Sequence, residues 1–192
     1  MILEILGYVS GILIFLTAVP YIRDIRLGKT KPHRTSWFIW VILSLIALFT
    51  QLAKGGTFSL LLPAGDALAA LIIFLFSIKR GVGGFATKDI LALIGAIIGL
   101  ILWYFTGNPV LALVIIMAVD FLGAILTILK AYKHPETETL VTWSLAGFAG
   151  LLAVLSVGKM NSVLLAYPLY ICLINSATAI AVLAGRRKNK IK

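Results

Sequence analysis

Hydrophobic residues are gathered along this chain into seven long stretches, separated by short segments that hold most of the charged residues. The stretches cover residues 3–22, 35–53, 58–78, 89–106, 109–129, 139–157 and 163–185. Each is close to the roughly 20 residues that an α-helix needs to cross the hydrocarbon core of a membrane. Backbone groups must be paired in lipid, and continuous apolar runs of this length favour helices. The pattern therefore predicts an all-α polytopic membrane protein with seven transmembrane helices.

The composition leaves little room for anything else. Of 192 residues, 61% are hydrophobic and 12% are charged, which excludes a separate soluble domain beside the seven stretches. The first stretch has Glu4 near its start and its cations after its end, the reverse of a secretory signal peptide. We therefore expect this helix to be retained, in one compact bundle.

The positive charges are distributed unequally between the two sides of the predicted bundle. Fifteen of the 17 Lys and Arg residues follow the first, third, fifth and seventh stretches, and only Lys54 and Lys159 lie on the other side. The positive-inside rule then places the N-terminus outside and the C-terminus in the cytoplasm, and we expect the plasma membrane of a prokaryote. Topology also explains the net charge of +10, so the predicted partner is the lipid bilayer and not nucleic acid.

Two parts of the chain resemble each other in order and spacing. Residues 17–22 (Thr-Ala-Val-Pro-Tyr-Ile) match residues 117–122 (Met-Ala-Val-Asp-Phe-Leu), and each is followed by a loop with Lys and Pro and then by a tryptophan, Trp40 or Trp143. The third and seventh stretches each carry an early proline, Pro63 or Pro168, and end in a basic pair. Two helix triplets in the same orientation, related as parallel repeats, explain this pattern.

The repeat predicts four parts. Residues 1–81 form the first three-helix repeat, residues 82–107 a connector helix, residues 108–185 the second repeat, and residues 186–192 a basic cytoplasmic tail.

This plan resembles the SWEET and PQ-loop superfamily of membrane transporters. Residues 19–21 (Val-Pro-Tyr), residues 28–31 (Gly-Lys-Thr-Lys) and Ser36 look like a PQ-loop segment, with Tyr21 where the family has glutamine and Asp120-Phe121 in place of the second Pro-Gln. The resemblance implies alternating access by a three-plus-one-plus-three bundle. It also implies a central pocket with an asparagine on the third and seventh helices beside tryptophans. Asn175 matches one of these, and Asp66 is the central polar residue of the third stretch.

Intramembrane polar residues are the candidates for chemistry, because a carboxylate at membrane depth is costly and faces a cavity or a partner. Asp66 and Asp120 are the two carboxylates, and helical spacing gives each a face with small neighbours. The predicted substrate-binding residues are Asp66, Asp120, Asn175, Trp40 and Trp143, and the predicted hinges are Pro20, Pro63 and Pro168. Hydrogen bonds that only join helices are the alternative role for the acids and for Asn175.

The leading functional prediction is a secondary transporter of a small polar solute, such as a sugar or an amino acid, with proton coupling through the aspartates left open. The alternative is a membrane receptor or interaction protein of the same fold that binds a peptide or partner without solute flux. No enzyme is predicted, because the chain has no nucleophile elbow, HExxH or phosphate-binding motif; paired acids leave an intramembrane enzyme as a third reading. No cofactor or metal ligand set is predicted, and homo-oligomer formation is left open.

Overall fold

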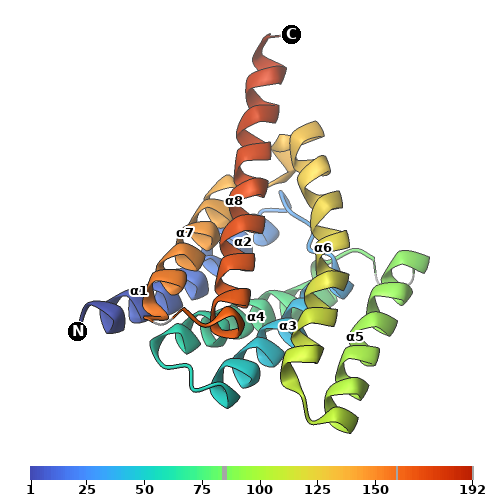
Figure 1. The fold of residues 1–192 in the computed structure, drawn as a ribbon. Helices are drawn as coiled ribbons and strands as arrows, with labels where there is room; N and C mark the ends of the chain where they lie inside the picture. The colour runs from blue at the N-terminus through green and yellow to red at the C-terminus, as the bar shows by residue number, and fades with distance from the viewer. Residues whose placement is uncertain (84–85, 159, 192) are drawn as a thin grey trace.

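The computed structural model is all-α, as predicted, and it describes residues 1–83, 86–158 and 160–191. No strand occurs in these ranges, where pairing is limited to an isolated bridge between His33 and Val82. Figure 1 shows the helices as rods that pack side by side around a common centre. They are α1 (Ile2–Leu16), α2 (Ala18–Arg26), α3 (Arg34–Ala53), α4 (Leu61–Arg80), α5 (Thr87–Thr106), α6 (Pro109–Lys133), α7 (Leu140–Ser156) and α8 (Ser162–Ile191), with short 3-10 turns η1 (Phe58–Leu60) and η2 (Pro135–Thr137).

Several helices have the length and composition of membrane spans. In the described part of the chain, four segments meet both conditions: Ile2–Arg26, Arg34–Ala53, Phe58–Arg80 and Ser162–Asn189, while Leu140–Ser156 is apolar but shorter. Large hydrophobic side chains, such as Leu68, Leu75 and Ile180, stay more than half exposed on the outside of the bundle. An apolar exterior of this kind needs lipid around it, which indicates a membrane protein.

The first apolar stretch is interrupted at one residue, Thr17, whose backbone stays in the α-helical region with φ −59° and ψ −26°. α1 ends at Leu16 and α2 begins at Ala18. The cause is Pro20, which has no N–H to donate to the carbonyl of Leu16 one turn earlier. The matching position in α6 is Asp120, and α6 is unbroken over 25 residues. The helix interruption is therefore present in one half of the chain and absent from the other.

The other two prolines lie in different settings. Pro63 is the third residue of α4, directly after η1, where a missing N–H costs no helical hydrogen bond. Pro168 lies inside α8 and is buried. Beyond it α8 continues to Ile191, so residues 186–191 of the predicted tail are helical and project past the neighbouring helices (Figure 1).

The helices pack in two groups with the same internal order. α4 packs against both α1 and α3, and α8 packs against both α7 and α6. The groups then meet through α1 with α7 and through α3 with α6. The third helix of each group is thus in the middle, and the first helix of either group contacts the second helix of the other. α5 packs on α6 and α3 at the edge of the bundle (Figure 1).

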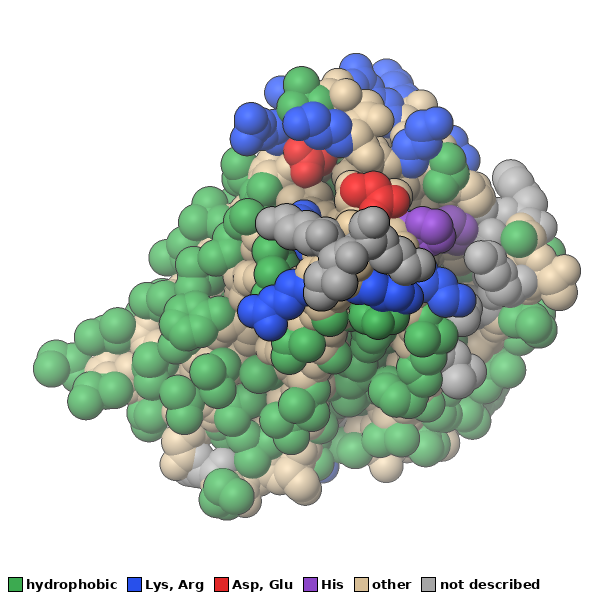
Figure 2. All heavy atoms as spheres, turned by 90° about the horizontal axis from the view of Figure 1, so that it is seen from above, with side chains coloured by type: hydrophobic (Ala, Val, Ile, Leu, Met, Phe, Trp, Pro, Cys, Tyr) green, Lys and Arg blue, Asp and Glu red, His purple; other side chains and the backbone are tan. Residues whose placement is uncertain are grey.

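The helix ends that carry the cations meet at one end of the bundle. An Arg80 guanidinium nitrogen donates to the carbonyl of Arg26 across 3.2 Å. The Lys188 ammonium lies 5.1 Å from the centre of the Tyr132 ring. Figure 2 shows blue Lys and Arg side chains over this end and hydrophobic side chains on the flanks. We call it the basic end.

Candidate functional site: a polar cavity between the helices

A cavity of about 80 Å³ lies between the helices. Described residues of α1, α2, α3, α4, α6, α7 and α8, together with Thr17 between α1 and α2, line it, and no described residue of α5 does. All five predicted substrate-binding residues are on its wall, namely Asp66, Asp120, Asn175, Trp40 and Trp143, whereas none of the predicted hinge prolines is. The structure thus brings together residues up to 135 positions apart in the sequence.

Asp120 of α6 is held by two donors from different helices. The Trp40 indole Nε1 of α3 donates to Oδ1 across 2.6 Å. The Tyr170 hydroxyl of α8 donates to Oδ2 in a second, short hydrogen bond. Both bonds are charge-assisted when the carboxylate is ionised, which makes them stronger than bonds between neutral groups. Asp120 therefore joins α3, α6 and α8 at the cavity.

Asp66 of α4 has a similar pair of partners. Its Oδ2 accepts a short hydrogen bond from the Tyr167 hydroxyl of α8 and lies 3.0 Å from Ser44 Oγ of α3. Ser44 Oγ is also 2.7 Å from the carbonyl oxygen of Trp40. Asp66 Oδ1 has no hydrogen-bond partner among the described residues.

The two acids are bound by the same pair of helices. Trp40 and Ser44 are four residues apart on α3, and Tyr167 and Tyr170 are three residues apart on α8. Residues at these spacings lie on one face of a helix, one turn apart. One turn of α3 and one turn of α8 therefore bind Asp120, through Trp40 and Tyr170. The adjacent turns bind Asp66, through Ser44 and Tyr167.

Aromatic rings form the wall on the α2 and α3 side. The Tyr21 and Trp37 ring centres are 5.0 Å apart, and the Trp37 and Trp40 rings meet edge to face at 4.6 Å. Trp40 packs against all three hydrophobic clusters of the bundle. Trp143 of α7 adds a further indole to the lining.

Asn175 is a buried polar group in the cavity wall. Its residue exposure is 9%, and its Nδ2 donates to the carbonyl of Ile171 across 2.8 Å. Its Oδ1 has no hydrogen-bond partner among the residues that the structure describes. Because Asn175 lines the cavity, this oxygen is an acceptor available to a bound molecule.

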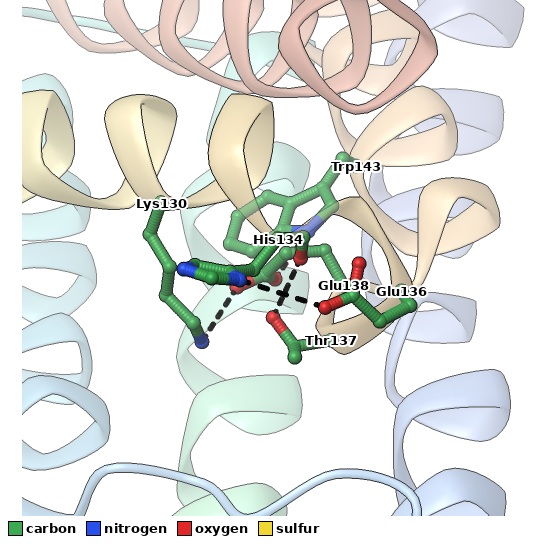
Figure 3. A network of polar contacts seen from close by, with 6 residues as sticks. All are labelled: Lys130, His134, Glu136, Thr137, Glu138 and Trp143. Carbon is green, nitrogen blue, oxygen red and sulfur yellow. Dashed lines mark hydrogen bonds and ion pairs between the residues drawn. The ribbon is translucent and has the colours of Figure 1, made fainter. Parts of the chain in front are cut away.

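A polar network lies beside the cavity on the side of the basic end. Glu138 accepts from the Trp143 indole across 3.0 Å and pairs with Lys130 at 3.0 Å, while only 8% of its side chain is exposed. Figure 3 shows Glu138 between these two residues. Next to Glu138, the Thr139 hydroxyl donates to Asp24 of α2 across 2.7 Å. The start of α7 is thus tied to both α6 and α2.

Figure 3 also places the adjoining turn η2, where His134 Nδ1 is 3.6 Å from Glu136 Oε1 and the Thr137 hydroxyl donates to the His134 carbonyl. Both His134 and Glu136 are well exposed. The turn therefore fixes the position of Glu138 from outside the cavity.

The opposite side of the cavity is packed with apolar side chains. Ile14, Leu43, Ile46, Leu62 and Tyr167 belong to one cluster and are at most 2% exposed. The Ser10 hydroxyl of α1 donates to the carbonyl of Ala149 in α7 across 2.8 Å, which holds the two groups together there. The cavity is therefore bounded by a polar network on one side and by dense packing on the other.

The sequence analysis missed the two tyrosines and Glu138. Counting back from Asn175 in steps of four reaches Ile171 and Tyr167, so helical spacing would have found one tyrosine. Glu138 gave no such signal, because it stands in a loop and reaches the site through Trp143.

The site shows no arrangement for a metal, since the described residues contain no cluster of three or more His, Cys, Asp or Glu side chains that could hold one.

Comparison of the chain with protein-family models gives no match, and comparison with curated proteins gives none either. The function proposed below therefore rests on the geometry of the cavity.

Proposed function

We propose that this protein is a secondary transporter that moves a small polar solute across the membrane by alternating access. The observation that carries the proposal is the cavity, in which two carboxylates, an amide and several indoles meet inside an otherwise apolar bundle. Polar groups at membrane depth are costly, and they mark substrate and ion pathways in membrane proteins. Helices on all sides contribute to the wall, so a relative movement of the two helix groups changes access to it.

The proposal includes a seven-span topology with two parallel three-helix repeats and a connector, as in the SWEET and PQ-loop superfamily. It is supported by the shared packing order, with α4 in the middle of one group and α8 in the middle of the other. The position of α5 at the edge supports its role as the connector. The N-terminus is then outside and the basic end is cytoplasmic, because the cations gather there.

Flux into proteoliposomes tests the proposal. The purified full-length chain is reconstituted, and uptake of labelled sugars, amino acids and amines is compared with uptake into protein-free liposomes. A transporter gives saturable uptake of at least one solute, and Asp66→Asn lowers it while Glu4→Gln, an acid outside the cavity, leaves it unchanged. Absence of flux for every solute, together with tight binding of a peptide or protein, would instead make the chain a receptor.

Proton coupling is a separate part of the proposal. Asp120 and Asp66 are the carboxylates that carry the proton in such a mechanism, since no other acid lines the cavity in the described residues. An imposed pH gradient then accelerates uptake by the natural chain and has no effect on Asp120→Asn. If uptake by both proteins ignores the gradient, the transporter is a uniporter.

A further inference from the structure

The lining of the cavity contains free acceptors of hydrogen bonds, and the donors next to its two carboxylates are used within the wall. Asp66 Oδ1 and Asn175 Oδ1 have no hydrogen-bond partners among the described residues. The donors nearby are already used, because the Trp40 indole and the Tyr170 hydroxyl bind Asp120 and the Tyr167 hydroxyl binds Asp66. A ligand with N–H or O–H groups of its own therefore satisfies these acceptors.

The charges of the wall have one sign. Asp66 and Asp120 are the ionisable acids, and no Lys, Arg or His is found among the described residues that line the cavity. A carboxylate in an apolar interior is costly unless a positive charge or a proton accompanies it. A cationic ligand supplies the missing charge, whereas an anion is repelled and a zwitterion leaves its own carboxylate without a partner.

The aromatic rings favour the same kind of ligand. Tyr21, Trp37, Trp40 and Trp143 line the cavity beside the acids. A cation over the face of an indole or phenol ring is attracted by the ring quadrupole, most strongly for tryptophan and where water is excluded. Acids and aromatic faces together therefore favour a cationic ligand over a neutral polar ligand.

The volume limits the size of the ligand. A cavity of about 80 Å³ has room for on the order of five to eight water molecules at about 10–15 Å³ each. This is enough for a few non-hydrogen atoms. A small ammonium or guanidinium group fits, and a bulky solute does not enter without a change in the packing.

We infer that the cavity is a binding site for small organic cations with N–H donors, that is, primary ammonium or guanidinium compounds. The cation is held between Asp66 and Asp120, donates to the free oxygen of Asn175 and packs against the indole rings. The inference rests on the proposed transport function only for its biological use, because binding itself needs no flux.

Binding to the detergent-purified full chain tests the inference through intrinsic tryptophan fluorescence and thermal stability. The probes are millimolar guanidinium and ethylammonium, compared with urea, tetramethylammonium, acetate and sodium as chlorides or sodium salts at equal ionic strength. Urea has the shape of guanidinium without its charge, and tetramethylammonium has the charge without N–H donors. We expect saturable binding of guanidinium or ethylammonium, and weaker or no binding of the other four.

Variants assign the binding to the cavity. Asp66→Asn and Asn175→Leu each weaken the binding of the organic cation by at least about tenfold, because each removes an acceptor in a place shielded from water. Glu4→Gln serves as the matched control and binds as the natural chain does. If Asp66→Asn fails to fold, Asn175→Leu still gives the answer, since it removes no charge and only one hydrogen bond to the carbonyl of Ile171.

The outcomes separate this inference from the proposed function. Equal binding of urea and guanidinium, the same saturation with sodium alone, or no saturable binding of either organic cation would overturn the inference, while uptake of another solute would leave the transporter intact. Cation binding that depends on Asp66 and Asn175 without any flux in proteoliposomes would support the inference and remove the transport function.

Discussion

The Trp40 indole of α3 donates to the Asp120 carboxylate of α6 across 2.6 Å, and this contact joins the two helix groups at the cavity. Trp40 packs against all three hydrophobic clusters, so its ring position is fixed from every side. The fixed ring holds the carboxylate in turn. Asp120 is thereby held by packing that belongs to the fold as a whole, and we expect removal of either partner to lower both stability and ligand binding.

A double-mutant cycle on Trp40 and Asp120 measures this coupling. Asp120→Ala leaves the indole N–H and the Tyr170 hydroxyl without acceptors in the interior, and each such group costs about 1–3 kcal/mol. Trp40→Phe removes the N–H, so the double variant is less destabilised than the sum of the two single variants. We expect a coupling energy of about 1–3 kcal/mol from unfolding measurements. Additive single effects would show that the contact contributes nothing.

The tyrosines of α8 give a second prediction. Tyr167→Phe and Tyr170→Phe each remove one hydroxyl that binds an acid while the ring stays, and we expect a loss in apparent stability of about 1–3 kcal/mol for each, together with weaker ligand binding. Tyr104→Phe is the matched control, because Tyr104 is 83% exposed. Thermal unfolding of the three variants decides the point; equal melting temperatures would mean that the hydroxyls only accompany the acids.

More of the fold than of the candidate site could be predicted from sequence patterns. Apolar stretches of helical length predicted the all-α class because lipid leaves the backbone few other choices. Asp66, Asp120 and Asn175 were found because polar groups are rare in such stretches. Tyr167 and Tyr170 were missed because tyrosine is ordinary in a membrane helix, and only the packing of α8 against α6 brings the Tyr170 hydroxyl to Asp120.

The break after α1 follows the same rule. Proline at position 20 shows the lost hydrogen bond in the sequence itself, and the helix is interrupted at Thr17. A hinge at this place stays a prediction. The extension of α8 through the basic tail was not predictable from hydropathy. Residues 186–189 are polar and exposed, and helix formation there depends on continuation of the turns before them.

Glu138 and Lys130 differ in what their removal should cost. The Lys130 side chain is 55% exposed and that of Glu138 is 8% exposed, so the ammonium stays largely hydrated, and the carboxylate keeps its Trp143 donor when Lys130 is replaced. Lys130→Met should therefore lower the free energy of unfolding by less than Glu138→Ala does. Glu138→Ala takes the acceptor from the Trp143 indole and should cost about 1–3 kcal/mol. Comparable effects of the two variants, measured by unfolding, would show that the ion pair matters more than the indole contact.

Proline substitutions distinguish hinges from helix starts. Pro20→Ala restores an N–H that can donate to the carbonyl of Leu16, so α1 and α2 become one continuous helix. If the interruption serves movement between the helix groups, initial uptake rates in proteoliposomes fall severalfold while the binding constant of the solute changes little.

Pro63→Ala is the matched control, since Pro63 lies in the first turn of α4 and its replacement restores no helical hydrogen bond. A hinge at α1–α2 therefore predicts a slow Pro20→Ala transporter and a normal Pro63→Ala transporter. Equal rates for both variants and the natural chain would assign the break to local geometry alone, and a loss of binding in Pro20→Ala would place its effect on the Thr17 and Tyr21 side of the cavity wall.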